Sequence, residues 1–188
     1  MRLFVALELP GGVRDALAAW ATQVTGGDEA LRAVAPGALH LTLAFLGVRA
    51  PAEVGPIAEA AARGVRGGAW PAALGLGEAL WLAPRRPHVL TVAVEDPGGA
   101  LGALRERVVA ELAGELGWEP EQRRFRAHVT VARVRRGRAP RGYDVPAPPR
   151  PGAFGAAAVA VMRSELGAGG ARYERLATVG PEAAGTVS

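Results

Sequence analysis

Two short triplets carry the residues of this sequence that are best suited to chemistry. Residues 40–43 are HLTL and residues 128–131 are HVTV, so Thr42 follows His40 by two positions and Thr130 follows His128 likewise. An imidazole with an ordinary pKa of about 6.5 can accept or donate a proton at neutral pH. A threonine hydroxyl can donate a hydrogen bond to an oxygen that gains negative charge. The triplets therefore predict acid–base chemistry on an anionic group.

Both triplets lie in segments with the composition of a buried strand, residues 39–47 and 126–134. Side chains alternate between the faces of a strand, so His40 and Thr42 share one face while Leu39, Leu41 and Leu43 share the other. The leucines are expected to enter the core, and the second triplet has the same pattern with valines. Each strand should present its histidine and threonine on the face away from the core.

An internal repeat relates the two triplets. Residues 5–17 (VALELPGGVRDAL) match residues 92–104 (VAVEDPGGALGAL) at 8 of 13 positions with an offset of 87, and His128 follows His40 by 88. We therefore expect one bilobal domain over residues 1–180, with halves at about 1–86 and 87–180 related by a pseudo-twofold axis. Such an axis would bring both histidines to a shared central cleft.

The spacing of apolar and turn residues predicts an α+β fold. Strands are expected at 2–10, 39–47, 70–82 and 126–134, a hairpin at 153–163 and 171–179, and helices at 13–24, at 51–65 and up to about 116. Residues 137–152 contain five prolines and should form a long loop beside a cleft. Residues 181–188 are expected to be a flexible tail.

Several kinds of site and setting are excluded or disfavoured. The absence of cysteine excludes disulfides, thiolate metal sites and a thiol nucleophile. Neither His-x-His nor Gly-x-Ser-x-Gly occurs, so zinc binding and a serine triad lack support. Without a signal-peptide pattern or an apolar run of about 18 residues, a cytoplasmic protein with no membrane partner is expected.

The basic residues are unevenly distributed. All 22 are arginine, the net charge is +4, and eight of them lie between residues 123 and 141, including Arg126 and Arg133. This local positive field should attract an anion. The alternative is a solvated basic loop beside a strand.

These motifs resemble those of a known family. HLTL and HVTV match the two His-x-Thr-x motifs of the 2H phosphoesterase superfamily. More closely, RLFVALELP, LHLTLAFLG, FRAHVTVARV and SELGAGGARYE resemble segments of the bacterial and archaeal RNA 2′,3′-cyclic phosphodiesterases, also called 2′-5′ RNA ligases. The resemblance extends from residue 2 to about 179. It implies two lobes of antiparallel strands with helices outside and a cleft between them.

The resemblance also implies an activity and a set of roles. The reaction would be metal-independent hydrolysis of a terminal 2′,3′-cyclic phosphate to a 2′-phosphate, with possible 2′-5′ RNA ligase activity. His40 would be the proton donor and His128 the proton acceptor, with Thr42 and Thr130 beside the phosphate. No cofactor is expected, and the partners would be RNA ends or small cyclic nucleotides bound by a monomer.

Charge favours the same division of roles. Arg126 and Arg133 lie close to His128 in sequence and would disfavour its protonated form, whereas His40 lies on an apolar strand without a nearby arginine. We therefore expect His128 to accept a proton from water and His40 to carry the proton for the leaving group.

Phe45 and Arg133 each lie five positions after a histidine. In the family these positions bind the nucleotide, and we add Arg126 to the substrate-binding set. The odd spacing would place both residues on the core face of a regular strand, so a bulge or a strand end must follow the threonine. Core packing is an equal alternative for Phe45, whereas a buried unpaired arginine would be expensive.

A nucleotide- or RNA-binding module without catalysis is the alternative function. Opening a cyclic phosphate needs a base for the water and an acid for the departing ribose oxygen, which two histidines can supply. Binding alone would be served better by the arginines already present. No threonine lies two positions after His88, which is expected to be an ordinary polar residue at the start of a strand and outside the site.

Overall fold

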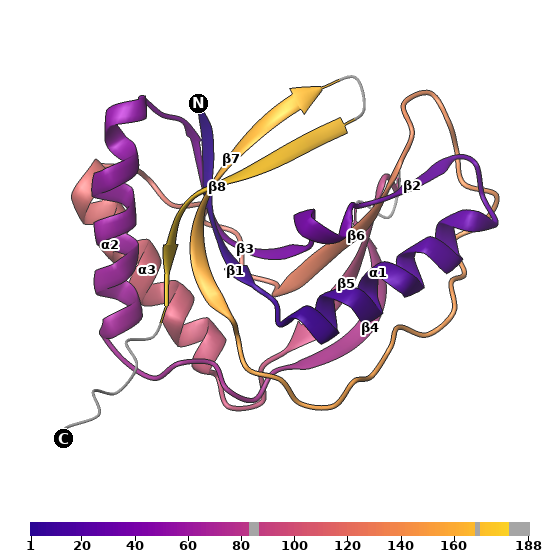
Figure 1. Ribbon diagram of the computed structural model, residues 1–188, viewed down its shortest axis with the longest axis horizontal. Coiled ribbons are helices and arrows are strands. Elements are labelled where there is room, and N and C mark those ends of the chain that lie inside the picture. The colour runs from indigo at the N-terminus through magenta and orange to yellow at the C-terminus, as the bar shows by residue number, and fades with distance from the viewer. Residues whose placement is uncertain (83–86, 168–169, 181–188) are drawn as a thin grey trace.

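The computed structural model describes residues 1–82, 87–167 and 170–180, which form an antiparallel sheet with three helices (Figure 1). The helices are α1 (Gly11–Gly26), α2 (Val54–Arg66) and α3 (Ala100–Leu116), with 3₁₀ turns η1 (Pro36–Ala38) and η2 (Pro51–Glu53). The strands are β1 (Arg2–Glu8), β2 (Leu31–Ala33), β3 (His40–Val48), β4 (Gly75–Leu82), β5 (Val89–Glu95), β6 (His128–Val134), β7 (Ala158–Gly167) and β8 (Gly170–Val179). The predicted α+β class is confirmed.

The two motif strands meet at the centre of the sheet. The strand order is β4-β5-β6-β3-β1-β7-β8, and β6 and β3 run antiparallel with Leu41 opposite Val129. Each of these residues directly follows its histidine, so equivalent positions face each other across a local twofold axis. Past this pair, β2 replaces β3 as the neighbour of β6, from Ala132 to Val134. The sheet is continuous across the two halves of the sequence, because β4 pairs with β5 and β1 pairs with β7. The division into two lobes near residue 86 stays a prediction.

The helices cover the face of the sheet that carries Leu41 and Val129. Helix α1 packs against β2 and β6, while α3 packs against β3 and α2 (Figure 1). Their apolar residues recur at helical spacing and join Leu41 and Val129 in one buried cluster: Val13, Leu17 and Trp20 from α1, and Leu101, Leu104, Val108 and Leu112 from α3. The opposite face, which carries the histidines and threonines, is left without a helix among the described residues.

Three elements differ from the sequence-based prediction. Strand β4 begins at Gly75 rather than near residue 70, β7 spans Ala158–Gly167 rather than 153–163, and the three-residue strand β2 was not predicted. So short a strand has no clear periodicity of its own and is held by its pairing with β6. The loop at 137–152 contains neither helix nor strand, as expected. The predicted tail at 181–188 lies outside the described residues.

None of the helices in the described part of the chain combines the length and the apolar character that crossing a membrane requires.

Candidate active site

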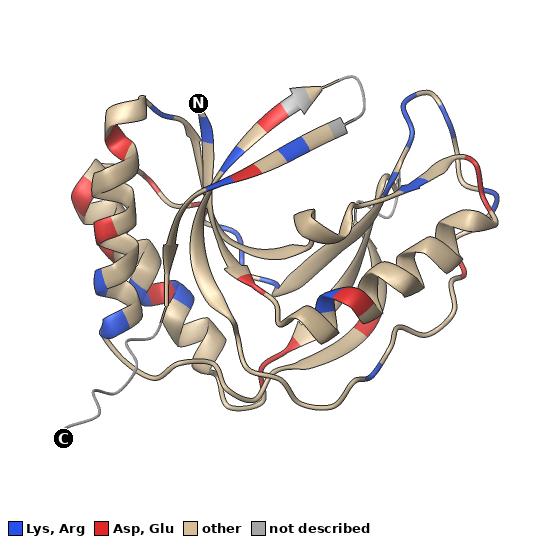
Figure 2. Ribbon diagram, viewed as in Figure 1, with Lys and Arg blue, Asp and Glu red and all other residues tan. Residues whose placement is uncertain are grey.

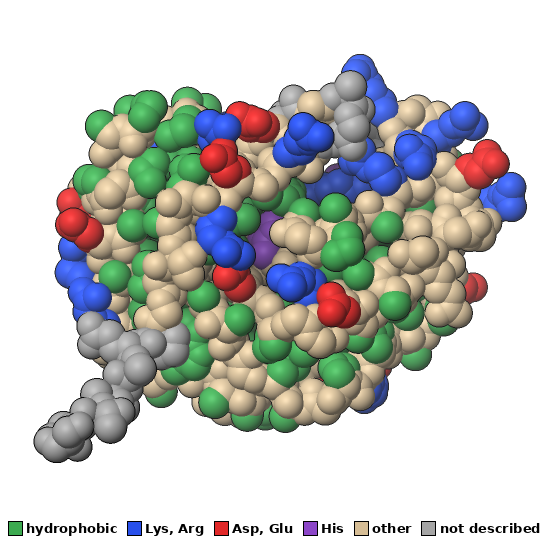
Figure 3. All heavy atoms as spheres, in the orientation of Figure 1, with side chains coloured by type: hydrophobic (Ala, Val, Ile, Leu, Met, Phe, Trp, Pro, Cys, Tyr) green, Lys and Arg blue, Asp and Glu red, His purple; other side chains and the backbone are tan. Residues whose placement is uncertain are grey.

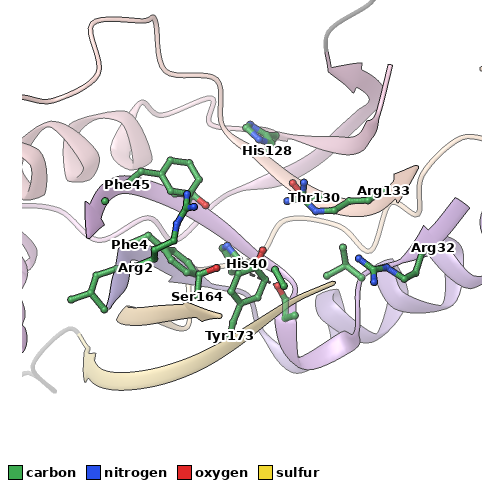
Figure 4. A pocket seen from close by; sticks show the side chains of 16 residues that line it. Arg2, Phe4, Arg32, His40, Phe45, His128, Thr130, Arg133, Ser164 and Tyr173 are labelled. Atoms are coloured by element: carbon green, nitrogen blue, oxygen red, sulfur yellow. Dashed lines mark hydrogen bonds between the residues drawn. The ribbon is translucent and has the colours of Figure 1, made fainter. Parts of the chain in front are cut away.

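A cleft of about 610 Å³ brings the two triplets together. His40 and Thr42 of β3 line it, as do His128 and Thr130 of β6. Figure 3 shows histidine at the bottom of a hollow on this face, with basic side chains around the rim. In Figure 4 the imidazoles of His40 and His128 lie across this space from each other. The fold thus brings together two His/Thr pairs that lie 88 positions apart in the sequence.

Matching β-bulges turn Phe45 and Arg133 toward the cleft. In β3 the register with β1 shifts at Leu43, and in β6 the register with β5 shifts at Val131. Both additional residues are buried and lie three positions after the histidine. Each additional residue shifts the alternation of faces by one position, so Phe45 and Arg133 line the cleft instead of the core. The predicted bulge is confirmed, and the core-packing alternative is wrong because Phe45 is 65% exposed.

The two imidazoles are held by the same hydrogen bond. Nδ1 of His40 lies 2.7 Å from the carbonyl oxygen of Ala38, and Nδ1 of His128 lies 2.6 Å from that of Arg126. A carbonyl oxygen only accepts, so Nδ1 donates in both rings. The nitrogen left for a substrate is Nε2 in each case, an acceptor when neutral and a donor when protonated. Both histidines therefore present the same atom, Nε2, for proton transfer.

His40 lies in a pocket of aromatic rings. Its ring centroid is 4.9 Å from that of Phe4 and 5.0 Å from that of Tyr173. Burial lowers the pKa of His40 below the ordinary 6.5, the Nδ1 hydrogen bond opposes this shift, and the positive charge of Arg133 adds to it. The expectation that His40 is remote from arginine charge is therefore wrong. Arg133 follows the other histidine in sequence but acts on His40 across the cleft.

The two ends of the cleft differ in chemistry. Phe45 lies with Arg2 at one end, and Arg32 lies with Arg133 at the other, with the histidines between them (Figure 4). Basic residues also lie on the loop after β6 and on the β7–β8 hairpin (Figure 2). The cleft can therefore hold an anion between the histidines and an aromatic group beside Phe45.

This geometry agrees with a match to a family of known proteins. A family model described as the 2′-5′ RNA ligase superfamily matches residues 13–165, which is most of the chain. The chain belongs to the 2′-5′ RNA ligase superfamily. The resemblance of the His-x-Thr motifs to this family is thereby confirmed.

Solved structures support the same assignment within the superfamily. The crystal structure of TT0787 from Thermus thermophilus is 31% identical, with a TM-score of 0.79 over 95% of this chain and 97% of that one. E. coli LigT in its apo form is 25% identical, with a TM-score of 0.74 over 95% and 97% of the two chains. LigT has also been solved with 3′-AMP, with a TM-score of 0.72 over 94% and 95% at the same identity. No curated protein sequence matches the chain.

Not every predicted residue lies in the cleft of this superfamily member. The Arg126 side chain is exposed and does not line the cleft, although its carbonyl oxygen orients His128. The arginines between residues 123 and 141 also do not all face the cleft. Arg133 faces the cleft, whereas Arg135 and Arg141 donate to the carbonyl oxygens of residues 29 and 27. The segment therefore does not form one continuous anion site.

Other residues of the site were not predicted from the sequence. Phe4 and Tyr173 enclose His40, and Arg2, Arg32 and Ser164 also line the cleft. Phe4 belongs to an apolar strand and Tyr173 to an edge hairpin, so neither position marks a site by its type. Arg32 comes within reach only through the pairing of β2 with β6. These contacts depend on the tertiary fold rather than on spacing along the chain.

The sequence predicts that His88 lies outside the site and gives no support for a metal site. His88 is exposed and does not line the cleft. In the described ranges, no group of three or more histidine, aspartate or glutamate side chains is arranged so that it could hold a metal ion. The donor groups at the cleft are imidazoles, hydroxyls and guanidiniums, which suit a phosphate rather than a cation.

Proposed function

We propose that this protein hydrolyses 2′,3′-cyclic phosphates at RNA ends or on small nucleotides, leaving a 2′-phosphate and a free 3′ hydroxyl. The observation that carries this proposal is the matched geometry of His40 and His128. Both donate Nδ1 to a backbone carbonyl two residues earlier, which leaves two Nε2 atoms for one cleft. Two proton-transferring groups facing one anion site suit a displacement at phosphorus.

The proposed reaction is one in-line displacement. Water attacks phosphorus while Nε2 of His128 takes its proton, and the bond from phosphorus to O3′ breaks as His40 donates the Nε2 proton to that oxygen. Burial lowers the pKa of His40, so its protonated form is a stronger acid than an exposed imidazolium. The negative charge of the bound phosphate favours that protonated form in the complex. No metal ion takes part in any of these steps.

The other cleft residues are assigned to binding and to charge. The hydroxyls of Thr42 and Thr130 donate hydrogen bonds to the non-bridging oxygens, where negative charge increases. The guanidinium of Arg133 adds positive charge at one end of the cleft, and the exposed ring of Phe45 stacks on the base. Arg126 would make only an outer contact with longer RNA. E. coli LigT, solved with 3′-AMP, supports a nucleotide as the class of ligand.

The test is a direct assay on a defined substrate. The protein is incubated with a short RNA that ends in a 2′,3′-cyclic phosphate, in excess chelator, and the product is analysed by mass spectrometry. A mass gain of one water and a 2′-phosphate are expected. Binding without turnover would favour the non-catalytic alternative. Turnover that is lost in chelator and restored by one divalent metal would overturn the metal-independent mechanism.

A further inference from the structure

A second cavity adjoins the cationic end of the cleft. It measures about 460 Å³ and shares Arg32, Arg133 and Tyr173 with the first, while Arg172 of β8 lines only the second. None of the three arginine side chains forms a hydrogen bond or a salt bridge with residues 1–82, 87–167 or 170–180. Arg172 stands opposite Glu165 in the β7–β8 register, but that carboxylate forms its salt bridge with Arg163. Three guanidiniums that form no salt bridge make this second cavity suited to an anion.

The pairing of two of these arginines strengthens the case. Arg32 of β2 and Arg133 of β6 are direct partners across the two strands, and both side chains line the same two cavities. Like charges at directly opposed positions destabilise a sheet. An anion between the two guanidiniums would offset that repulsion. The arrangement therefore fits ligand binding better than it fits a structural role.

The covalent structure of a nucleotide indicates which anion reaches this cavity. On the ribose, the base is attached at C1′ beside the 2′ oxygen, and the chain continues from C4′ beside the 3′ oxygen. If the cyclic phosphate lies between the histidines and the base stacks on Phe45, the 5′ side of the sugar points to the opposite end of the cleft. That end carries Arg32 and Arg133 (Figure 4).

We propose that Arg32, Arg133 and Arg172 bind the phosphate on O5′ of the terminal nucleotide. In an RNA end this group is the preceding phosphodiester, and in a small substrate it is a 5′-phosphomonoester. The protein then selects substrates that carry a 5′-phosphate over nucleoside cyclic phosphates. This inference rests on the proposed function, because it assumes that the cyclic phosphate lies between the histidines.

Three substrates with the same base test the proposal. They are a nucleoside 2′,3′-cyclic phosphate, the same compound with a 5′-phosphate, and the dinucleotide in which that phosphate is a diester. We expect kcat/KM to be about tenfold or more higher for both phosphorylated substrates at low salt, as for other charge-assisted contacts. An advantage for the dinucleotide alone would identify the RNA chain as the source of the phosphate. Turnover of none of them would refute the proposed function instead.

Single substitutions then test whether the second cavity is where the 5′-phosphate binds. Arg32→Met and Arg172→Met should each reduce the advantage of the phosphorylated substrates several-fold, with a smaller effect on the nucleoside substrate. Arg2→Met is the matched control, because Arg2 lines the same cleft at the Phe45 end and should leave the ratio unchanged. A ratio near one in the wild type, or an unchanged ratio in both Arg32→Met and Arg172→Met, would overturn the proposal. Loss of the ratio in Arg2→Met would show that the nucleotide binds in the opposite direction.

A stability measurement separates binding from a structural role. Removing one member of the Arg32–Arg133 pair relieves repulsion, so Arg32→Met should have a Tm equal to or above that of the wild type at low salt. A clear loss of Tm would instead assign Arg32 to the fold. Arg172 is exposed, so its variant should fold normally and provides the selectivity measurement in either case.

Discussion

Arg105 of α3 donates a hydrogen bond from Nε to the carbonyl oxygen of Leu43, at 3.3 Å. Leu43 is the additional residue of the β3 bulge, where the regular pairing with β1 is interrupted. The guanidinium of Arg105 also lies 4.8 Å from the ring centroid of Phe125, which precedes β6. One side chain therefore contacts both the bulge that orients Phe45 and the segment that leads to the second triplet.

We predict that Arg105→Met raises KM for nucleotide substrates several-fold, with a smaller effect on kcat. The bulge carbonyl would lose its donor, which destabilises the fold by about 1 kcal/mol and releases Phe45 from its orientation. Arg107→Met is the control, because Arg107 donates to the carbonyl oxygens of Gly64 and Ala69 instead. It should lower the free energy of unfolding by urea without changing KM. Equal KM changes in the two variants would contradict a positioning role for Arg105.

We predict that His40→Ala and His128→Ala each reduce kcat by about 10²–10⁴-fold, the usual effect of losing one positioned acid or base. His88→Ala should have little effect, because His88 lies outside the cleft. Steady-state kinetics on a dinucleotide cyclic phosphate, with circular dichroism to verify folding, provide the comparison. Similar activity in all three variants would refute the two-histidine mechanism.

The roles of the two histidines can be distinguished by the acidity of the leaving group. In a 2′,3′-cyclic phosphorothiolate with sulfur at the 3′ bridging position, the thiolate can leave without being protonated. We expect this substrate to restore much of the rate lost in His40→Ala and little of the rate lost in His128→Ala. Restoration in His128→Ala alone would reverse the assignment of donor and acceptor.

The environment of His40 predicts a pH dependence of stability. Its pKa is lower in the folded protein than the ordinary 6.5, so between the two values the unfolded chain binds more protons. The free energy of unfolding should therefore decrease as the pH falls through about 6.5 toward the folded-state pKa, and level off below it. Urea unfolding at a series of pH values should show this slope, and His40→Gln should reduce it. A slope unaffected by His40→Gln would contradict the burial argument.

The charge of Arg133 adds a separate expectation. Because a nearby positive charge disfavours imidazolium, Arg133→Met should raise the pKa of His40. NMR titration of the His40 ring measures this directly, with Arg138→Met as a control for an exposed arginine outside both cavities. An unchanged pKa in Arg133→Met would show that the two groups do not interact across the cleft.

The two triplets were predictable because they depend on local rules. The alternation of faces along a strand placed His40 with Thr42, and the repeat placed His128 with Thr130. The odd spacing of Phe45 required a bulge, which the register of β3 confirms. Regular alternation would have buried Phe45, whereas its expected role required it to face the cleft. This conflict was what predicted the bulge.

The electrostatics of the site could not be predicted in the same way. Distance along the chain suggested that Arg133 acts on His128, whereas the fold brings its charge to bear on His40. The aromatic pocket of Phe4 and Tyr173 is assembled from β1 and β8, and Arg32 is positioned by β2. Through-space contacts of this kind depend on strand order, which no local pattern in the sequence specifies.

The pairing of Leu41 with Val129 makes the centre of the sheet symmetric in its backbone. Two antiparallel strands that meet at equivalent residues have the symmetry of a homodimer, so two identical half-length chains could form the same central pairing. In such a dimer, every residue would occur on both sides of the axis. Because both halves belong to one chain, equivalent positions can differ, and the fifth position after the histidine is phenylalanine in one half and arginine in the other. The two ends of the cleft therefore offer different chemistry although the strands between them are paired symmetrically.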